Sequence, residues 1–115
     1  MGIGIVQKFD AFRSRKLLDS TKGQTCQNCD GAICRNDTVV SAHSNWGEHG
    51  KGGSIKAADC FIAWLGDKCH FWLDQGGSTM DPTNRFHYTE KLELWQHAQY
   101  KTLHEMFKQG IIIVK

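Results

Sequence analysis

The 115-residue sequence predicts a single small α+β domain that is supported by a bound zinc ion. Its length allows one modest hydrophobic core, and a second domain is not expected. A β-branched stretch at residues 37–43 and a helical pattern at residues 89–110 lie in separate parts of the chain. Cys26 and Cys29 form a CxxC pair, a spacing that lets a tight turn aim two thiolates at one tetrahedral ion.

In the first half of the chain, a short helix is predicted around residues 16–21, with Gly23 as its C-terminal stop. Residues 37–43, DTVVSAH, predict a β-strand because three of them are β-branched and turn-forming residues flank them. Residues 46–54 are too rich in glycine to form anything but a loop. The apolar stretch 55–66, IKAADCFIAWLG, is compatible with either a strand or a short helix.

In the second half, residues 67–76, DKCHFWLDQG, predict a helix of about two turns that ends at the following glycines. Residues 76–84 form a linker or turn. The pattern over residues 89–110 predicts a long amphipathic helix that stops at Gly110. The short apolar tail after it, IIIVK, is expected to pack against the domain.

The cysteine content indicates metal binding. No window of the sequence approaches the roughly 18 apolar residues that span a bilayer, and the N-terminus lacks the features of a signal peptide. The expected location is therefore the cytoplasm, with no membrane partner. Five cysteines in that reducing compartment are more consistent with metal ligands than with disulfides. Cys60 lies inside an apolar run and is expected to be a small buried residue.

Three stretches together resemble a known superfamily: CQNC at residues 26–29, VVSAHSN at 39–45 and GKGGSIKAADCFIAWLGDKCHFWLDQG at 50–76. Their order and spacing are similar to those of small phage and prophage nucleases of the HNH, or His-Me finger, superfamily. The similarity covers roughly residues 13–110. It implies one nuclease domain over residues 1–115, with a zinc-supported ββα-metal core at about 24–78. Helices would flank this core on its N- and C-terminal sides, the latter at about 89–109.

The same resemblance implies an activity and a setting. Such a chain would be a metal-dependent DNA endonuclease that hydrolyses phosphodiester bonds, with Mg²⁺, Mn²⁺ or another divalent ion as catalytic cofactor. It would act in phage recombination or repair, in the host cytoplasm, with a phage recombination or packaging protein as a further partner. The competing hypothesis is a zinc-stabilised DNA- or protein-binding module that retains the fold and lacks hydrolysis.

One departure from the family concerns the zinc site. The family usually has a second CxxC just before its helical histidine, and Gly66 stands here at the first position of that pair. Cys34 is an additional thiol close to the first CxxC, which suggests that it substitutes for the missing ligand. The predicted zinc ligands are Cys26, Cys29, Cys34 and Cys69. Alternatives are a three-cysteine site completed by Cys60, Asp67 or water, and a domain without zinc.

The resemblance also implies the catalytic residues. His43, at the end of its predicted strand, corresponds to the general base, a role that suits a largely neutral imidazole. Asp59 is the nearest match to the family residue that holds the loop of the base, although it is equally suited to capping the following element. His70 and Asp74 lie four residues apart, so on a helix both can approach one divalent ion. For Asp74, an ordinary solvated carboxylate is the alternative.

The glycine-rich loop is the predicted DNA contact. Lys51 and Lys56 would act as point charges on the phosphates, with His49 as a further partner and Trp46 as a stacking residue. Residues 1–56 contain eight Lys/Arg against five Asp/Glu, so the small basic excess of the chain lies in this half. The loop does not match GxxxxGK[ST], which excludes a P-loop, and a flexible solvated loop is the alternative. The other three tryptophans are expected in the core.

Overall fold

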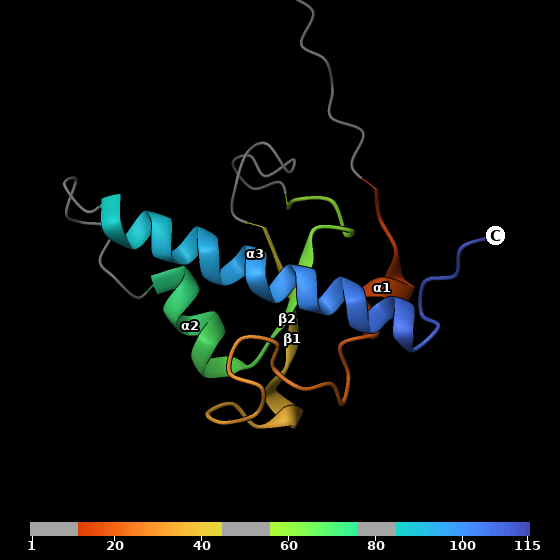
Figure 1. Ribbon diagram of the computed structural model, residues 1–115, viewed down its shortest axis with the longest axis horizontal. Helices are drawn as coiled ribbons and strands as arrows, with labels where there is room; N and C mark the ends of the chain where they lie inside the picture. Colours follow the sequence, from red (N-terminus) through yellow and green to blue (C-terminus); the bar gives the residue numbers. More distant parts are fainter. Residues whose placement is uncertain (1–11, 45–55, 76–84) are drawn as a thin grey trace, which may run out of the picture.

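The computed structural model describes residues 12–44, 56–75 and 85–115. The chain forms a small α+β structure, as expected, with a two-stranded antiparallel sheet and three α-helices in these ranges. The elements in chain order are α1 (Arg15–Asp19), the short 3₁₀ helix η1 (Asn36–Thr38), β1 (Val40–His43), β2 (Ile62–Leu65), α2 (Asp67–Gln75) and α3 (Arg85–Lys108). Figure 1 shows them along the chain.

The hairpin of β1 and β2 is the centre of the structure. Its register pairs Val40 with Leu65 at one end and His43 with Ile62 at the other. All four residues of β2 are buried, and the backbone of Trp64 bonds outside the hairpin. Its N–H donates to Thr102 Oγ1 at 2.9 Å and its C=O accepts from the Gln27 N–H at 2.8 Å. Since an isolated hairpin is only marginally stable in water, these outer partners are needed to hold it.

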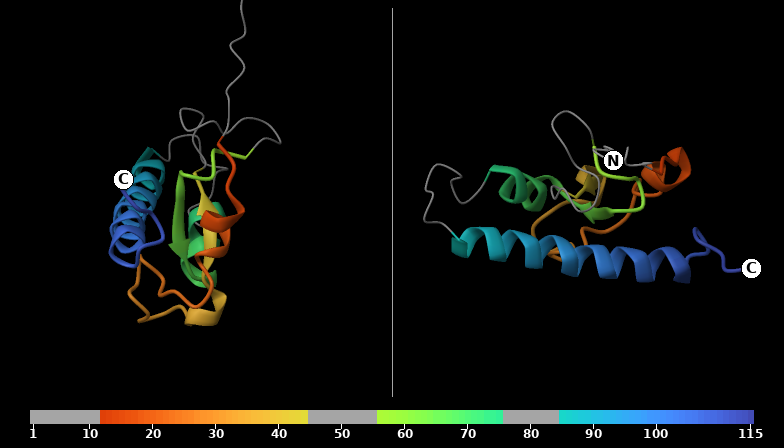
Figure 2. Two further views of the ribbon diagram at one scale, coloured as in Figure 1. Left: turned by 90° about the vertical axis from the view of Figure 1, so that its right-hand side faces the viewer. Right: turned by 90° about the horizontal axis from the view of Figure 1, so that it is seen from above.

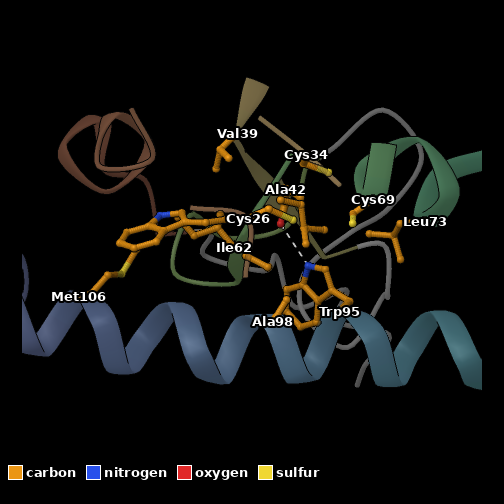
Figure 3. Packing of buried hydrophobic residues seen from close by; sticks show 13 residues of the cluster. Cys26, Cys34, Val39, Ala42, Ile62, Cys69, Leu73, Trp95, Ala98 and Met106 are labelled. Atoms are coloured by element: carbon orange, nitrogen blue, oxygen red, sulfur yellow. Dashed lines mark hydrogen bonds between the residues drawn. The ribbon is translucent and has the colours of Figure 1, made fainter. Parts of the chain in front are cut away.

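Helix α3 covers one side of the hairpin, as Figure 2 shows. Figure 3 shows Trp95 and Ala98 of α3 directed toward the sheet, with the Trp95 indole N–H donating to the Ala42 carbonyl at 3.1 Å. The helix begins four residues earlier than expected, at Arg85, and Gly110 follows its end with a φ of 75°. A positive φ is readily adopted by glycine, which explains the predicted stop.

Residues 12–19, called here the N-terminal segment, cover the other face of β1. Ser14 is the N-cap of α1, and its hydroxyl accepts a hydrogen bond from the Leu17 N–H at 3.2 Å. The Ser41 hydroxyl of β1 donates to the Leu18 carbonyl at 2.9 Å, which ties α1 to the strand. The predicted short helix is present, but it begins one residue and ends two residues earlier than the expected 16–21. Gly23, with a φ of 77°, lies beyond its C-terminal turn.

Three expectations from the sequence need correction. The strand expected over residues 37–43 begins only at Val40, because Asn36–Thr38 form the 3₁₀ helix η1. Within residues 55–66, β2 occupies only the last part, and Cys60 is exposed rather than buried. The reason is a turn closed by the Phe61 N–H and the Ala58 carbonyl at 2.9 Å, which places Cys60 outside the strand. The C-terminal tail packs only in part: Ile111 and Ile112 contact the core, whereas the next two residues are largely exposed.

Of the three tryptophans expected in the core, two are buried and one is partly buried. Trp64 and Trp95 are buried, and Trp72 is half-buried.

None of the helices in the described part of the chain combines the length and apolar character that crossing a membrane requires.

Candidate functional site

Four cysteines from distant parts of the chain meet at one point. Their sulfur atoms all lie within 4.8 Å of one another, and three of the four side chains are buried. A tetrahedral zinc ion with bonds of about 2.3 Å requires its sulfurs to be about 3.8 Å apart, close to this arrangement. The cluster is compatible with a structural zinc ion, and its members are the predicted ligands Cys26, Cys29, Cys34 and Cys69.

The loop that supplies three of these cysteines is shaped to turn its amides toward sulfur. Asp30 and Gly31 both have a positive φ, of 55° and 85°, and reverse the chain after the CxxC. The Cys34 N–H then donates to Cys29 Sγ at 3.3 Å. Burial alone would raise the pKa of Cys29, but hydrogen bonds from backbone amides and from the Cys26 thiol lower it to about 6. This favours the thiolate form that binds zinc.

The other side of the cluster is less favourable to charge. Burial raises the pKa of both Cys34 and Cys69, even though the Asn28 side-chain amide donates to Cys69 Sγ at 3.2 Å. A bound cation reverses this preference, because a thiol that coordinates a metal is deprotonated. The donor set is therefore compatible with a metal ion, whose charge would offset the cost of ionising these two buried thiols.

Gly66 explains how Cys34 reaches the cluster. A Cβ atom added at Gly66 would lie 2.1 Å from the Cβ of Cys34 and 2.7 Å from its sulfur. The side chain of Cys34 thus occupies the space that a side chain at position 66 would need. Of the alternative ligands, Cys60 is exposed in its turn, and the Asp67 carboxylate accepts from the Lys68 N–H at 2.8 Å. Neither belongs to the four-residue group.

A second group of candidate site residues surrounds His43 at the end of β1. His43 Nε2 lies 2.8 Å from Asp59 Oδ1, and the exposed fractions of the two side chains are 16% and 4%. The other carboxylate oxygen of Asp59 accepts from the Ser14 N–H at 2.7 Å, and Arg13 Nη1 lies 3.2 Å from Oδ1. The Asp59 carboxylate thus bonds to the N-terminal segment and to His43. Among the described residues it does not cap β2, the element that follows it.

The charge state of Asp59 follows from these contacts. Burial would raise its pKa, but hydrogen bonds from His43, the Ser14 amide and Arg13 outweigh burial and hold the pKa below its ordinary value. The carboxylate is therefore ionised near neutral pH and can only accept hydrogen bonds. Because the carboxylate only accepts, His43 Nε2 is the donor in this bond, and Nδ1 is then the acceptor nitrogen of the neutral form of the ring.

His43 faces the N-terminal segment because of its place in the strand. Side chains two residues apart lie on the same face of a strand, and Ser41 already faces α1 through Leu18. A pocket of about 400 Å³ opens there. Its lining residues are Arg13, Ser14, Arg15, Leu18, His43, Lys56 and Asp59. The two arginines were not predicted from sequence, although the basic stretch FRSRK at residues 12–16 was a local signal.

The predicted metal ligands on α2 also lie side by side. His70 Nε2 is 3.1 Å from Asp74 Oδ2, and both side chains are partly exposed. Helix α2 follows directly after β2 and packs against α3, to one side of the hairpin (Figure 1). Within the described ranges, the cysteine cluster is the one group of three or more potential metal-ligating side chains. The structure therefore assembles the His70–Asp74 pair without a third ligand from these ranges.

The predicted DNA contacts fall mostly on residues that the structure does not describe. Trp46, His49 and Lys51 lie outside the described residues. Lys56 is exposed and lines the pocket of His43, and its carbonyl accepts from Arg13 Nη2 at 2.9 Å.

Comparison with models of protein families, with curated proteins and with solved structures finds no match to this chain.

Proposed function

We propose that this chain is a metal-dependent DNA endonuclease of the HNH type. The observation that supports this most directly is the His43–Asp59 pair at 2.8 Å, which borders a pocket lined by three cationic side chains. A base held by a buried carboxylate suits abstraction of a proton from water. Cationic walls suit a phosphodiester substrate. The chain order of β1, β2 and α2 supports the proposal, because a ββα core would have its elements in that order.

In the proposed reaction, His43 Nδ1 accepts a proton from the attacking water. Asp59 remains ionised, holds the imidazole through Nε2 and stabilises the imidazolium that forms. Arg13 and the Ser14 amide fix the carboxylate from the other side, so that it does not follow the ring when the proton moves. The chain itself therefore supplies a base and the groups that orient it.

A divalent ion would be held by His70 and Asp74, which offer one nitrogen and one carboxylate donor one helical turn apart. Water and phosphate oxygens would supply its other ligands. When bound, the ion neutralises charge on the scissile phosphate and on the departing oxygen. The cysteine cluster has a separate role. A zinc ion there would tie the 26–34 loop to the first turn of α2 and so fix the helix that presents His70.

The biological setting is part of the same proposal. The resemblance to phage and prophage nucleases supports a role in DNA recombination or repair within a host cytoplasm, with a recombination or packaging protein as a further partner. The positive charge around His43 supports DNA as the substrate class.

A second candidate is a zinc-stabilised DNA- or protein-binding module without hydrolysis. The specific observation in its favour is that the described part of the chain provides two donors at the α2 pair and no third. Such a module would keep the cysteine cluster and the cationic pocket and would bind DNA through them.

Cleavage assays separate the two candidates. Zinc-loaded protein, freed of loosely bound ions by dialysis, is incubated with supercoiled and with branched DNA while Mg²⁺, Mn²⁺ or Ni²⁺ is added in turn. The nuclease proposal expects nicked or linear products with at least one of these ions, and none with His43→Ala. DNA binding without cleavage in every lane would favour the binding module.

A further inference from the structure

We propose that the pocket beside His43 is a phosphate-binding site in which the Arg15 and Lys56 side chains contact the ligand. This inference rests on the proposed function, because it identifies the substrate group that lies next to the base. It also makes the N-terminal segment a part of the substrate site.

Arg13 forms a fixed wall of this pocket. Its Nη1 donates to the Ala57 carbonyl at 2.6 Å and contacts Asp59, and its Nη2 donates to the Lys56 carbonyl at 2.9 Å. These bonds clamp the turn before β2 onto the N-terminal segment. The guanidinium is therefore engaged by the protein, and its positive charge contributes to the pocket without being the main contact for a ligand.

Arg15 and Lys56 are the cations with capacity for a ligand. The Arg15 side chain is 81% exposed, and its contact with Asp19 is a surface pair at 3.9 Å, which contributes little stability. Lys56 is exposed as well, and only its backbone carbonyl is bound by Arg13. The two side chains come from segments far apart in the sequence and converge on the same pocket.

Charge and size both favour a phosphate group. Three cations and one carboxylate line the pocket, so its formal charge is +2 with His43 neutral, equal to the net charge of the whole chain. Guanidinium and ammonium groups are the side chains that bind phosphate most strongly. A volume of about 400 Å³ is within the range of small-ligand pockets and can take a nucleotide unit of a strand.

The test compares two double variants that remove the same charge. Arg15→Gln/Lys56→Gln alters the pocket, and Lys16→Gln/Lys68→Gln alters two exposed lysines outside it. Binding of a short fluorescein-labelled DNA duplex is followed by anisotropy over a series of salt concentrations, without added divalent ion. Loss of two phosphate contacts should weaken binding about tenfold and reduce the salt slope by about 2. The control pair should retain most of the affinity and slope.

A second arm uses inorganic phosphate as the probe. Phosphate should shift the ring NMR signals of His43 in the wild type and in the control pair, and should not do so in the pocket variant. Displacement of phosphate by the unlabelled duplex identifies a nucleic-acid strand as the ligand, whereas phosphate binding without displacement assigns the site to a free phosphate ester. Equal loss of DNA binding in both double variants, together with no phosphate shift at His43, would overturn the proposal.

The outcome is independent of hydrolysis. Binding is measured without divalent ions, so a phosphate site can be confirmed even if the chain cleaves no DNA. Conversely, the wild type could cleave DNA while the pocket variant binds and cleaves DNA as well as the control pair does. That result would support the nuclease proposal and contradict the phosphate-binding site.

Discussion

The cysteine cluster and the His43 pocket are opposite kinds of site built around the same hairpin. The cluster is closed: four thiols from the chain surround one point, and three of them are buried. The pocket is open: a buried carboxylate holds a partly exposed histidine, and exposed cations line the space in front of it. A metal site with all its ligands from protein is typical of structural zinc, whereas a functional site keeps positions open for a ligand.

Both sites join segments that are distant in the sequence, but by different interactions. The cluster would join the 26–34 loop to α2 through metal–sulfur bonds, while Asp59 joins the N-terminal segment to β1 through hydrogen bonds. Loss of the metal–sulfur bonds should therefore affect the fold, whereas loss of the hydrogen bonds around Asp59 should mainly affect the chemistry of the His43 pocket.

The largest effect is expected from loss of zinc. Cys69→Ser, or treatment of the wild type with a chelator, should unfold the domain, because zinc binding to a small domain supplies on the order of 10 kcal/mol of folding free energy. Metal analysis of the purified wild type should give one tightly held zinc per chain, and circular dichroism should report unfolding. Cys60→Ser is the matched control and should change neither, since Cys60 lies outside the cluster. A chain that lacks zinc and melts unchanged in chelator contradicts the assignment.

The next largest effect is on cleavage. His43→Ala should lower the rate of DNA hydrolysis by about 10²-fold or more, the usual contribution of a general base. Its melting temperature and its DNA affinity should remain close to those of the wild type. The exposed His104 provides the control substitution, His104→Ala, which should cleave normally. Near-normal cleavage by His43→Ala would place the base elsewhere, with His49 the next candidate.

A smaller effect is expected at the α2 pair. His70→Ala should preserve the fold and raise the divalent-ion concentration required for half-maximal cleavage by about 10- to 100-fold, or abolish cleavage. Asp74→Ala should act in the same direction and more weakly. Titration of Mg²⁺ or Mn²⁺ against the cleavage rate measures both. Unfolding of His70→Ala to the extent seen with Cys69→Ser would instead make His70 a structural ligand.

The fourth prediction concerns the space shared by Gly66 and Cys34. Gly66→Ala should destabilise the domain by about 1–3 kcal/mol in urea unfolding and weaken zinc binding, because the new Cβ would displace Cys34. The exchange Gly66→Cys/Cys34→Gly should bind more zinc than Cys34→Gly alone, since it returns a thiol to the same space. If Gly66→Ala keeps full stability and zinc affinity, Cys34 does not depend on the glycine.

The smallest effect is expected from Asp59→Asn, about 1 kcal/mol of lost stability at neutral pH. The folded-state pKa of Asp59 lies below its ordinary value of 3.8, so its stabilisation is fully present above that value and is lost as the pH falls through the folded-state pKa. The difference in stability between wild type and variant should therefore shrink below about pH 4. Urea unfolding at pH 7 and at successively lower pH measures it, over the range in which metal analysis shows that both proteins keep their zinc. A difference that grows in acid contradicts the sign.

The sequence predicted the local features well where spacing alone determines them. The helix over α3 and its stop at Gly110 follow from periodicity and from a glycine that adopts a positive φ. The four cysteines were predicted from their spacing and from the family resemblance, and the structure brings them together. The burial of Cys60 was predicted wrongly, because an apolar neighbourhood in sequence does not reveal a turn that directs one side chain outward.

By itself the sequence predicted the thiols of the cluster, the histidine at a strand end beside the pocket, and the His–Asp spacing on α2. Only the tertiary structure decided that Cys34 fills the space at Gly66, that Asp59 bonds to His43, and that Arg13 and Arg15 line the same pocket. The physical reason is that backbone geometry fixes which residues within an element share a face. Contacts between elements depend on how the hairpin packs against distant segments, and no local spacing specifies that packing.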